Sequence, residues 1–132
     1  MSLSRERCDV CRPGMPHLGE AAAAELARQI DEAWEVVGGH EKLRRRVKTA
    51  DFGESMGLAV RIGFVAEAEG HHPDMHVHWG RLVIDLTTHA AKGLTRNDFV
   101  LAAKIDEILR PPDGAERLPR PDGAERLPQD GG

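Results

Sequence analysis

The stretch from Met75 to Thr88 constrains the fold more than any other part of the chain, because apolar and polar residues alternate along it on both sides of Gly80-Arg81. Such an alternation, with a period of two, indicates strands that bury one face and expose the other. Two loop residues with glycine first are typical of a type II′ hairpin turn. We therefore expect strands at 75–79 and 82–88 that pair as an antiparallel hairpin.

The position of the loop also sets the register of this hairpin. With Gly80-Arg81 as the loop, His76 faces Asp85, and an extension of the ladder places His72 opposite His89. The alternation divides the side chains of the hairpin between two faces. The core face receives Met75, Val77, Trp79, Leu82, Ile84 and Leu86, and the polar face receives His72, His76, His78, Asp85, Thr87 and His89.

Helical periodicity and capping residues predict the remaining elements. Glu20 to Ala33 has its apolar residues on one helical stripe, and Asp51 and Thr95 each start a capping-box pattern. The expected elements are helix 20–33, strands 34–37 and 43–47, helix 51–69, the two strands of the hairpin, and helix 95–109. This α-β-β-α-β-β-α order favours an α+β fold, with a four-stranded antiparallel sheet covered on one face by helices.

The helix expected at 51–69 is apolar on two sides. One stripe contains Phe52, Met56, Ala59 and Gly63, and the other contains Leu58, Ile62 and Val65. A helix that covers one sheet needs only one apolar stripe. We therefore expect the stripe through Ile62 to meet a neighbouring subunit in a homodimer or homotetramer.

The two ends of the chain differ from the domain expected at residues 18–110. Residues 1–17 form an N-terminal arm with Cys8-x-x-Cys11, a spacing found in zinc sites and in redox pairs. No second pair of ligands follows at zinc-finger spacing, which favours two ordinary reduced thiols in a loose arm. Residues 111–132 contain the sequence PDGAERLP twice, and their few apolar side chains predict a disordered tail.

Charge and hydropathy argue against two classes of partner. The 18 basic and 22 acidic residues give a net charge of −4, whereas a nucleic-acid-binding surface needs an excess of basic residues. No apolar run approaches the length of a membrane span or of a signal-peptide core. We expect a soluble cytoplasmic protein that binds neither nucleic acid nor membrane.

Histidines gather where the second helix ends and the hairpin begins. His71 follows Glu67 by four residues, a helical spacing at which a carboxylate can orient an imidazole. His72 and His89 are expected to converge with them at one end of the sheet. Imidazoles titrate near neutral pH, so such a cluster can donate one proton and accept another in the same turnover. No serine lies between His71 and His89, and both cysteines are distant in sequence, which argues against a covalent intermediate.

Other interpretations of these residues stay open. His76 and His78 are two apart on a strand and, together with His72 and His89, could hold a metal ion. Asp98 has a complete structural role as the acidic residue of a helix cap. Residue types and spacing alone leave an acid–base enzyme and a metal site about equally supported.

The pattern of an acidic residue, His-His-Pro, an aromatic residue, a later histidine and an aspartate resembles the pterin-4a-carbinolamine dehydratase family. The residues that carry it are Glu67, His71-His72-Pro73, Trp79, His89 and Asp98, with Leu86-Thr-Thr-His89 and Gly93-Leu94-Thr95 beside them. The resemblance covers roughly residues 8 to 109. Ala91 and Asn97 depart from it, because some members carry a cysteine and an arginine there.

This resemblance implies a hydro-lyase, a 4a-hydroxytetrahydrobiopterin dehydratase that removes water from a pterin carbinolamine and gives quinonoid dihydropterin. It implies His71, His72 and His89 as the acid–base set, and Glu67, Gly70, Thr87, Thr88 and Asp98 as substrate-contacting residues. It also implies that neither a metal nor an organic cofactor is needed, and that the partner is an aromatic amino-acid hydroxylase served by pterin recycling. The alternative is a non-catalytic pterin-binding or partner-stabilising module of the same fold.

Overall fold

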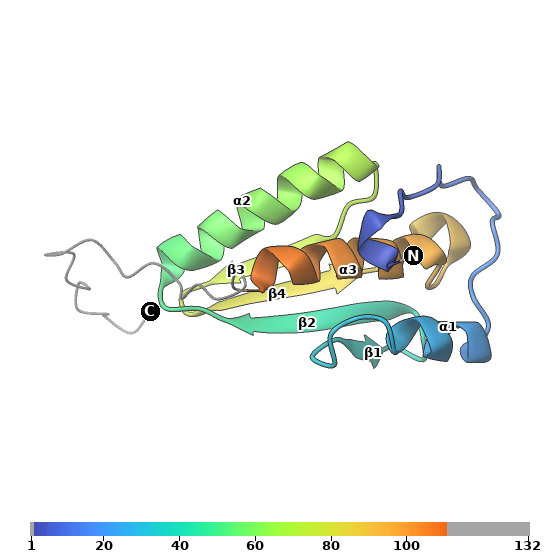
Figure 1. The fold of residues 1–132 in the computed structure, drawn as a ribbon, viewed down its shortest axis with the longest axis horizontal. Coiled ribbons are helices and arrows are strands. Elements are labelled where there is room, and N and C mark those ends of the chain that lie inside the picture. The colour runs from blue at the N-terminus through green and yellow to red at the C-terminus, as the bar shows by residue number, and fades with distance from the viewer. Residues whose placement is uncertain (1, 111–132) are drawn as a thin grey trace, which may run out of the picture.

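The structure, a computed structural model, describes residues 2–110 of the chain (Figure 1). Its elements are η1 (Leu3–Arg5), α1 (Glu20–Ala27), β1 (Glu35–Val37), β2 (Lys42–Lys48), α2 (Phe52–Glu69), β3 (Asp74–His78), β4 (Arg81–Leu86), η2 (His89–Ala91) and α3 (Arg96–Leu109). The order confirms the predicted α+β fold. No helix in this part of the chain has the length and hydropathy needed to cross a bilayer. The segment predicted as a disordered tail lies outside the described residues.

The four strands form one antiparallel sheet in the order β1-β2-β4-β3. Figure 1 shows α2 and α3 on the same side of this sheet. The core between the two layers contains the fully buried side chains Leu43, Leu82, Ile84, Leu86, Phe99, Leu101 and Ile105. Along β4 these apolar residues alternate with Arg81, Val83 and Asp85, which lie on the face away from the helices. On β2, Arg45 shares the helix-facing side with Leu43 and bonds to Asp106 of α3. The predicted sheet, covered on one face, is confirmed.

The register of the hairpin differs from the predicted one by two residues. β3 and β4 pair up to His78 and Arg81, so the loop consists of Trp79 and Gly80. Gly80 has a φ of 76°, the left-handed conformation that a type II turn requires at its second central residue. Glycine therefore takes the second loop position, and the expected turn with glycine first was wrong.

This shift changes which residues meet across the hairpin. The side chains that pair in the ladder stay on their expected faces, because a shift of two matches the period of a strand. The partners are different, however: His76 faces Val83, and Asp85 forms its ion pair with Arg44 on β2. Trp79, expected as a core residue, lies in the loop with 37% of its surface exposed.

The first helix is shorter than predicted, because a tertiary contact ends it. α1 stops at Ala27, whereas the periodicity continues to Ala33. Asp106 of α3 is buried and accepts hydrogen bonds from the backbone N–H of Asp31 and from Nε1 of Trp34. These bonds hold residues 31–34 against α3, and Trp34 is buried just before β1 begins. Packing onto α3 thus overrides the local helical pattern.

The two apolar sides of α2 have different surroundings from those predicted. Leu58 and Ile62 are buried in the core of their own subunit, so they are not a surface for a neighbour. The exposed apolar stripe consists of Phe52, Met56, Val60 and Phe64, which follow one another at intervals of four residues. The prediction that the stripe through Ile62 meets a neighbouring subunit was therefore wrong, because Leu58 and Ile62 pack in the core of their own subunit.

The N-terminal arm packs against the domain and is not loose. Leu3 in η1 is 2% exposed and belongs to the hydrophobic core. Ser4 bonds through its hydroxyl to Glu107 and through its carbonyl to Lys104, both on α3. Figure 1 shows η1 beside α3, at the end of the molecule where α2 meets β3. Residues 2–11 therefore reach the same end of the sheet as the histidines.

Candidate active site

The end of α2 places two histidines side by side at the hairpin base, which we define as the region where α2 meets β3 and where β4 ends. Gly70 caps α2 with a φ of 67°, and its N–H donates to the carbonyls of Ala66 and Glu67. A left-handed residue in this position is a common helix end and favours glycine. His71 and His72 follow directly, before β3 begins.

The ring of His71 is enclosed and bonded to an aspartate. Only 5% of the residue is exposed, and Nε2 lies 2.6 Å from Oδ1 of Asp98 on α3. A carboxylate oxygen accepts hydrogen bonds, so Nε2 is the nitrogen that carries the proton in this contact. A carboxylate bonded to one ring nitrogen selects the tautomer and holds the orientation of the imidazole.

Asp98 joins His71 to the end of β4 through its second oxygen. The residue has no exposed surface, and Oδ2 accepts hydrogen bonds from the backbone N–H of Thr95 (2.9 Å) and from the hydroxyl of Thr88 (2.8 Å). The one hydroxyl hydrogen of Thr88 is used in the hydrogen bond to Asp98. In the 2.8 Å contact between the two hydroxyls, Thr95 is therefore the donor and Thr88 the acceptor. The predicted capping box of α3 is confirmed, and the same carboxylate is the partner of His71.

His72, unlike His71, faces solvent. Its Nε2 lies 2.8 Å from Oε1 of Glu67, and 61% of the His72 side chain and 79% of the Glu67 side chain are exposed. The sequence spacing suggested that Glu67 orients His71. That pairing was wrong, because the left-handed turn at Gly70 directs His71 into the protein toward Asp98 and leaves His72 near the last turn of α2.

His89 lies on the other side of the hairpin base, in η2, and is exposed. The preceding residue, Thr88, is anchored by Asp98 and pairs with Gly93 in an isolated bridge. Thr87 donates its hydroxyl proton to the carbonyl of Glu41, 2.6 Å away. The ladder covers Asp74 to His78 and Arg81 to Asp85, so the predicted pairing of His72 with His89 is not part of the sheet.

These contacts define what the hairpin base can do chemically. Two solvent-exposed imidazoles, His72 and His89, are each adjacent in sequence to a buried member of the chain His71–Asp98–Thr88. The buried residues hold the backbone on both sides of the site. The exposed imidazoles are accessible to a ligand, and imidazole is the side chain that most often serves as a general acid or base.

Sequence reasoning missed a contribution of the N-terminal arm to this site. Sγ of Cys11 lies 3.8 Å from Nδ1 of His71, and Nδ2 of Asn97 lies 3.6 Å from the same sulfur. Cys8-x-x-Cys11 stands out in the sequence, but no periodicity links it to a histidine sixty positions later. Asn97, where some members of the resembled family carry an arginine, is the one sequence signal that coincides with this contact.

The other cysteine of the arm is in a different electrostatic environment. The backbone N–H of Cys8 donates to Glu69 at 2.8 Å, and its Sγ contacts the carbonyl of Asn97 at 3.6 Å. Burial, and then the negative charge of Glu69, raise the pKa of the Cys8 thiol to about 12. Cys8 therefore stays protonated at neutral pH, which makes it a poor nucleophile and a poor metal ligand.

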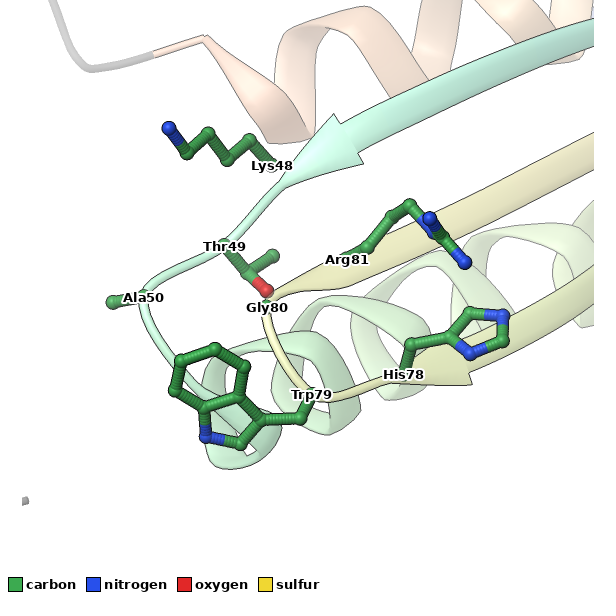
Figure 2. Close-up of a pocket in the computed structure, with 7 residues that line it drawn as sticks. All are labelled: Lys48, Thr49, Ala50, His78, Trp79, Gly80 and Arg81. Carbon is green, nitrogen blue, oxygen red and sulfur yellow. The ribbon is translucent and has the colours of Figure 1, made fainter. Parts of the chain in front are cut away.

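A hollow lies at the hairpin tip, which we define as the Trp79-Gly80 loop with its neighbouring residues. Lys48, Arg81 and His78 occupy directly paired positions on β2, β4 and β3, and they border a hollow of about 670 Å³. Figure 2 shows Lys48 and Trp79 on one side of the loop, with Arg81 and His78 directed to the other. These side chains do not converge on one point as the donors of a binding site would.

The metal-site interpretation finds no support among residues 2–110. No group of three or more His, Cys, Asp or Glu side chains in this range is arranged to hold a metal ion. The histidines proposed as ligands are separated along the molecule. His76 and His78 are exposed on β3, whereas His72 precedes that strand and His89 follows β4.

Comparison with known proteins gives consistent results. A sequence model of the family described as pterin 4 alpha carbinolamine dehydratase matches residues 16–108. A Gloeobacter violaceus protein named "Putative pterin-4-alpha-carbinolamine dehydratase 1" is 47% identical over 110 residues, which are 82% of this chain and 94% of that protein. A Rubrobacter xylanophilus protein named "Putative pterin-4-alpha-carbinolamine dehydratase" is 42% identical over 80% of this chain and 97% of its own length. The crystal structure of a transcriptional coactivator/pterin dehydratase from Brucella melitensis has a TM-score of 0.65 and 30% identity, covering 70% of this chain and 97% of that one.

Proposed function

This chain belongs to the pterin-4-alpha-carbinolamine dehydratase family, and from that premise we propose that it removes water from a 4a-hydroxytetrahydropterin to give a quinonoid dihydropterin. The observation that carries the proposal is the pair of exposed imidazoles, His72 and His89, on either side of the buried His71–Asp98–Thr88 chain. The product would return to aromatic amino-acid hydroxylases in the cytoplasm.

The reaction needs two proton transfers at neighbouring atoms of the pterin. The C4a–O bond breaks as the hydroxyl receives a proton and leaves as water. The adjacent ring nitrogen loses its proton, and its electron pair forms the new C=N bond. Two imidazoles on opposite sides of the bond can share this work, one in the acidic form and one in the basic form.

The contacts suggest different roles for the residues of the site. His72 and His89 are accessible and act directly on the substrate, and Glu67 orients His72 through the 2.8 Å bond. His71, Asp98 and Thr88 are buried and act as positioning residues that hold the backbone beside each exposed histidine. Gly70 and Thr87 belong to the same segments, just before the histidines, and are assigned to substrate contact.

The proposal is tested by stopped-flow dehydration of a freshly generated pterin carbinolamine. General acid–base catalysis is typically worth about 10²–10⁴-fold, so His72→Ala should lose most of the acceleration over buffer. If the two histidines act in one step, adding His89→Ala should remove little more. His76→Ala is a matched control, because it removes an exposed imidazole from β3 away from the site. Full activity in His72→Ala would refute the assignment.

A second candidate function rests on the Brucella protein, whose name also includes transcriptional coactivator. In this case the chain would bind pterin or stabilise a partner protein without catalysing dehydration. The same stopped-flow assay, combined with a fluorescence titration of pterin binding, separates the two functions. Pterin binding with a dehydration rate equal to that in buffer would favour the binding module.

The exposed apolar stripe on α2 supports a homodimer or homotetramer. Phe52, Met56, Val60 and Phe64 lie along one line of the helix, and Phe64 is 75% exposed. A line of large apolar side chains on a surface helix is a common contact between subunits. Phe64→Glu should therefore shift the sedimentation of the protein toward a smaller species, while Glu67→Gln, one turn away, should not. A native protein that sediments as a monomer would contradict the assembly.

A further inference from the structure

We propose that Cys11 is a positioning residue of the active site, in which its thiol donates a hydrogen bond to Nδ1 of His71 and fixes the orientation of that ring. Cys11 lies outside residues 16–108, the range that the family model matches. The contact joins Sγ and Nδ1 across 3.8 Å, within hydrogen-bonding range for sulfur. The expected effect on dehydration rests on the proposed function, whereas the bond itself can be tested without activity.

The two ring nitrogens of His71 have complementary requirements. Nε2 donates a hydrogen bond to Oδ1 of Asp98 at 2.6 Å. In the neutral ring Nδ1 therefore carries a lone pair and needs a hydrogen-bond donor. His71 is 5% exposed, which leaves little access for water. A buried acceptor without a donor is costly, and the Cys11 thiol supplies the donor at this position.

The position of Cys11 is held by the residue that precedes Asp98. Nδ2 of Asn97 donates to the carbonyl of Asp9 at 2.8 Å, and Oδ1 of Asn97 accepts from the N–H of Asp9 at 2.8 Å. The same Nδ2 points a hydrogen at Sγ of Cys11, 3.6 Å away. Sulfur is a weak acceptor and S–H a weak donor, so Cys11 can accept from Asn97 while it donates to His71. The first turn of α3 thus supplies Asp98, one partner of the His71 ring, and Asn97, which holds the other partner, Cys11.

This bond acts on catalysis through the residues beside His71. The ring is clamped between Asp98 and Cys11, and His72 is its neighbour in the chain. Asp98 also bonds to Thr88, the residue before His89. A His71 ring that loses one partner can rotate, and the loosened backbone then misplaces both exposed histidines. We expect a lower kcat with little change in KM, because the half-buried thiol acts on the substrate only through His71 and its neighbours.

Cys8 provides the matched control. It is in the same arm, three residues away, and its Sγ contacts the backbone carbonyl of Asn97 and not His71. Cys8→Ala removes a thiol of equal size from the same loop. It tests whether any disturbance of the arm produces the effect or whether the effect requires the contact with Nδ1.

The direct experiment is NMR of the ring nitrogens in uniformly ¹⁵N-labelled protein, with His71 assigned by His71→Gln. The native protein should show His71 with the proton on Nε2 and a hydrogen-bonded, unprotonated Nδ1. Cys11→Ala should move the Nδ1 resonance to the position of an acceptor without a donor. Cys11→Ser, which keeps a donor of similar size, should restore it, and Cys8→Ala should leave it unchanged. Thermal unfolding of each variant verifies that the fold is retained.

Steady-state kinetics measure the effect of the same variants on dehydration. Loss of one hydrogen bond predicts a kcat about 2- to 10-fold lower in Cys11→Ala, with recovery in Cys11→Ser. An Nδ1 resonance that does not move in Cys11→Ala, or that moves equally in Cys8→Ala, would overturn the proposal. If the native protein lacks dehydratase activity, the proposed function fails while the NMR result still decides the contact.

Discussion

Both ends of the β3–β4 hairpin carry histidine side chains, but the burial and hydrogen bonding of these histidines differ between the two ends. At the hairpin base, His71 is buried and bonded to Asp98, whose second oxygen is bonded to Thr88 and Thr95. At the hairpin tip, His78 is exposed in a row with Lys48 and Arg81. A buried, fully bonded histidine belongs to a rigid framework, whereas an exposed one in a row of cations is solvated surface.

This difference shows why histidine content is a poor guide to the site. Of the histidines expected on the polar face of the hairpin, His76 and His78 lie on β3 and are exposed. His72 and His89 are exposed as well, but each adjoins a buried residue that fixes its backbone. What distinguishes the base is the framework behind the imidazoles.

The largest effect is expected from removing the centre of the base framework. Asp98→Ala leaves the ring of His71, the hydroxyl of Thr88 and the N–H of Thr95 without their acceptor in a buried site. Unsatisfied buried groups and a lost helix cap together should lower the free energy of unfolding by about 3–5 kcal/mol, measured by urea denaturation. Asp74→Ala, an exposed carboxylate on β3, should change it by less than about 0.5 kcal/mol. Similar losses in the two variants would remove the distinction.

A smaller, pH-dependent effect is expected from the pair between the two ends. Asp85 accepts two hydrogen bonds from the Arg44 guanidinium, at 2.7 and 3.0 Å, and this contact lowers the pKa of the Asp85 carboxyl below its ordinary value. Because the folded pKa is the lower one, the pair stabilises the protein above the unfolded pKa, near 4. The contribution disappears as the pH falls through the folded pKa.

The measurement compares native protein with Asp85→Asn in urea at pH 7 and at pH 3. The native protein should be more stable by about 1 kcal/mol at pH 7, and the difference should shrink at pH 3. Arg44→Gln should show the same trend, because it removes the other partner. A difference that grows on acidification would contradict the assigned direction of the pKa shift.

The smallest effect is expected at the hairpin tip, and its sign is opposite. Arg81 lies directly opposite Lys48 across the sheet, and like charges in paired positions repel. Arg81→Glu replaces this repulsion by attraction and should stabilise the fold by about 0.2–1 kcal/mol at low salt. The gain should fall in high salt, because the row is exposed to solvent. Destabilisation by Arg81→Glu would indicate that the tip has a structural role like that of the base.

Much of the fold follows from local patterns in the sequence. Strand alternation identifies the buried face of the hairpin, and the caps at Asp51 and Thr95 mark the starts of α2 and α3 to within one residue. These features are local, since a cap or a strand face is decided by residues a few positions apart. The family motif adds the identity of the histidines, although their roles stay a prediction.

The remaining features depend on contacts between distant segments. The loop position was predicted wrongly because glycine fits either residue of a two-residue loop, depending on the turn type. The end of α1 was predicted wrongly because Trp34 bonds to Asp106, a residue 72 positions away. Spacing paired Glu67 with His71, although the turn at Gly70 separates them. The bond from Cys11 to His71 needs α3 and the arm to be folded together, so no local pattern could indicate it.

The docking of the arm on α3 has a consequence for the time at which the protein becomes functional. Ser4 and Glu107 are separated by 103 positions, and Cys11 and Asn97 by 86, so the arm leaves the ribosome well before the helix that it binds. Contacts this distant in sequence close late and fold slowly. A nascent chain that stops before α3 lacks Asn97 and Asp98, so the histidine framework is completed only on chains translated through α3.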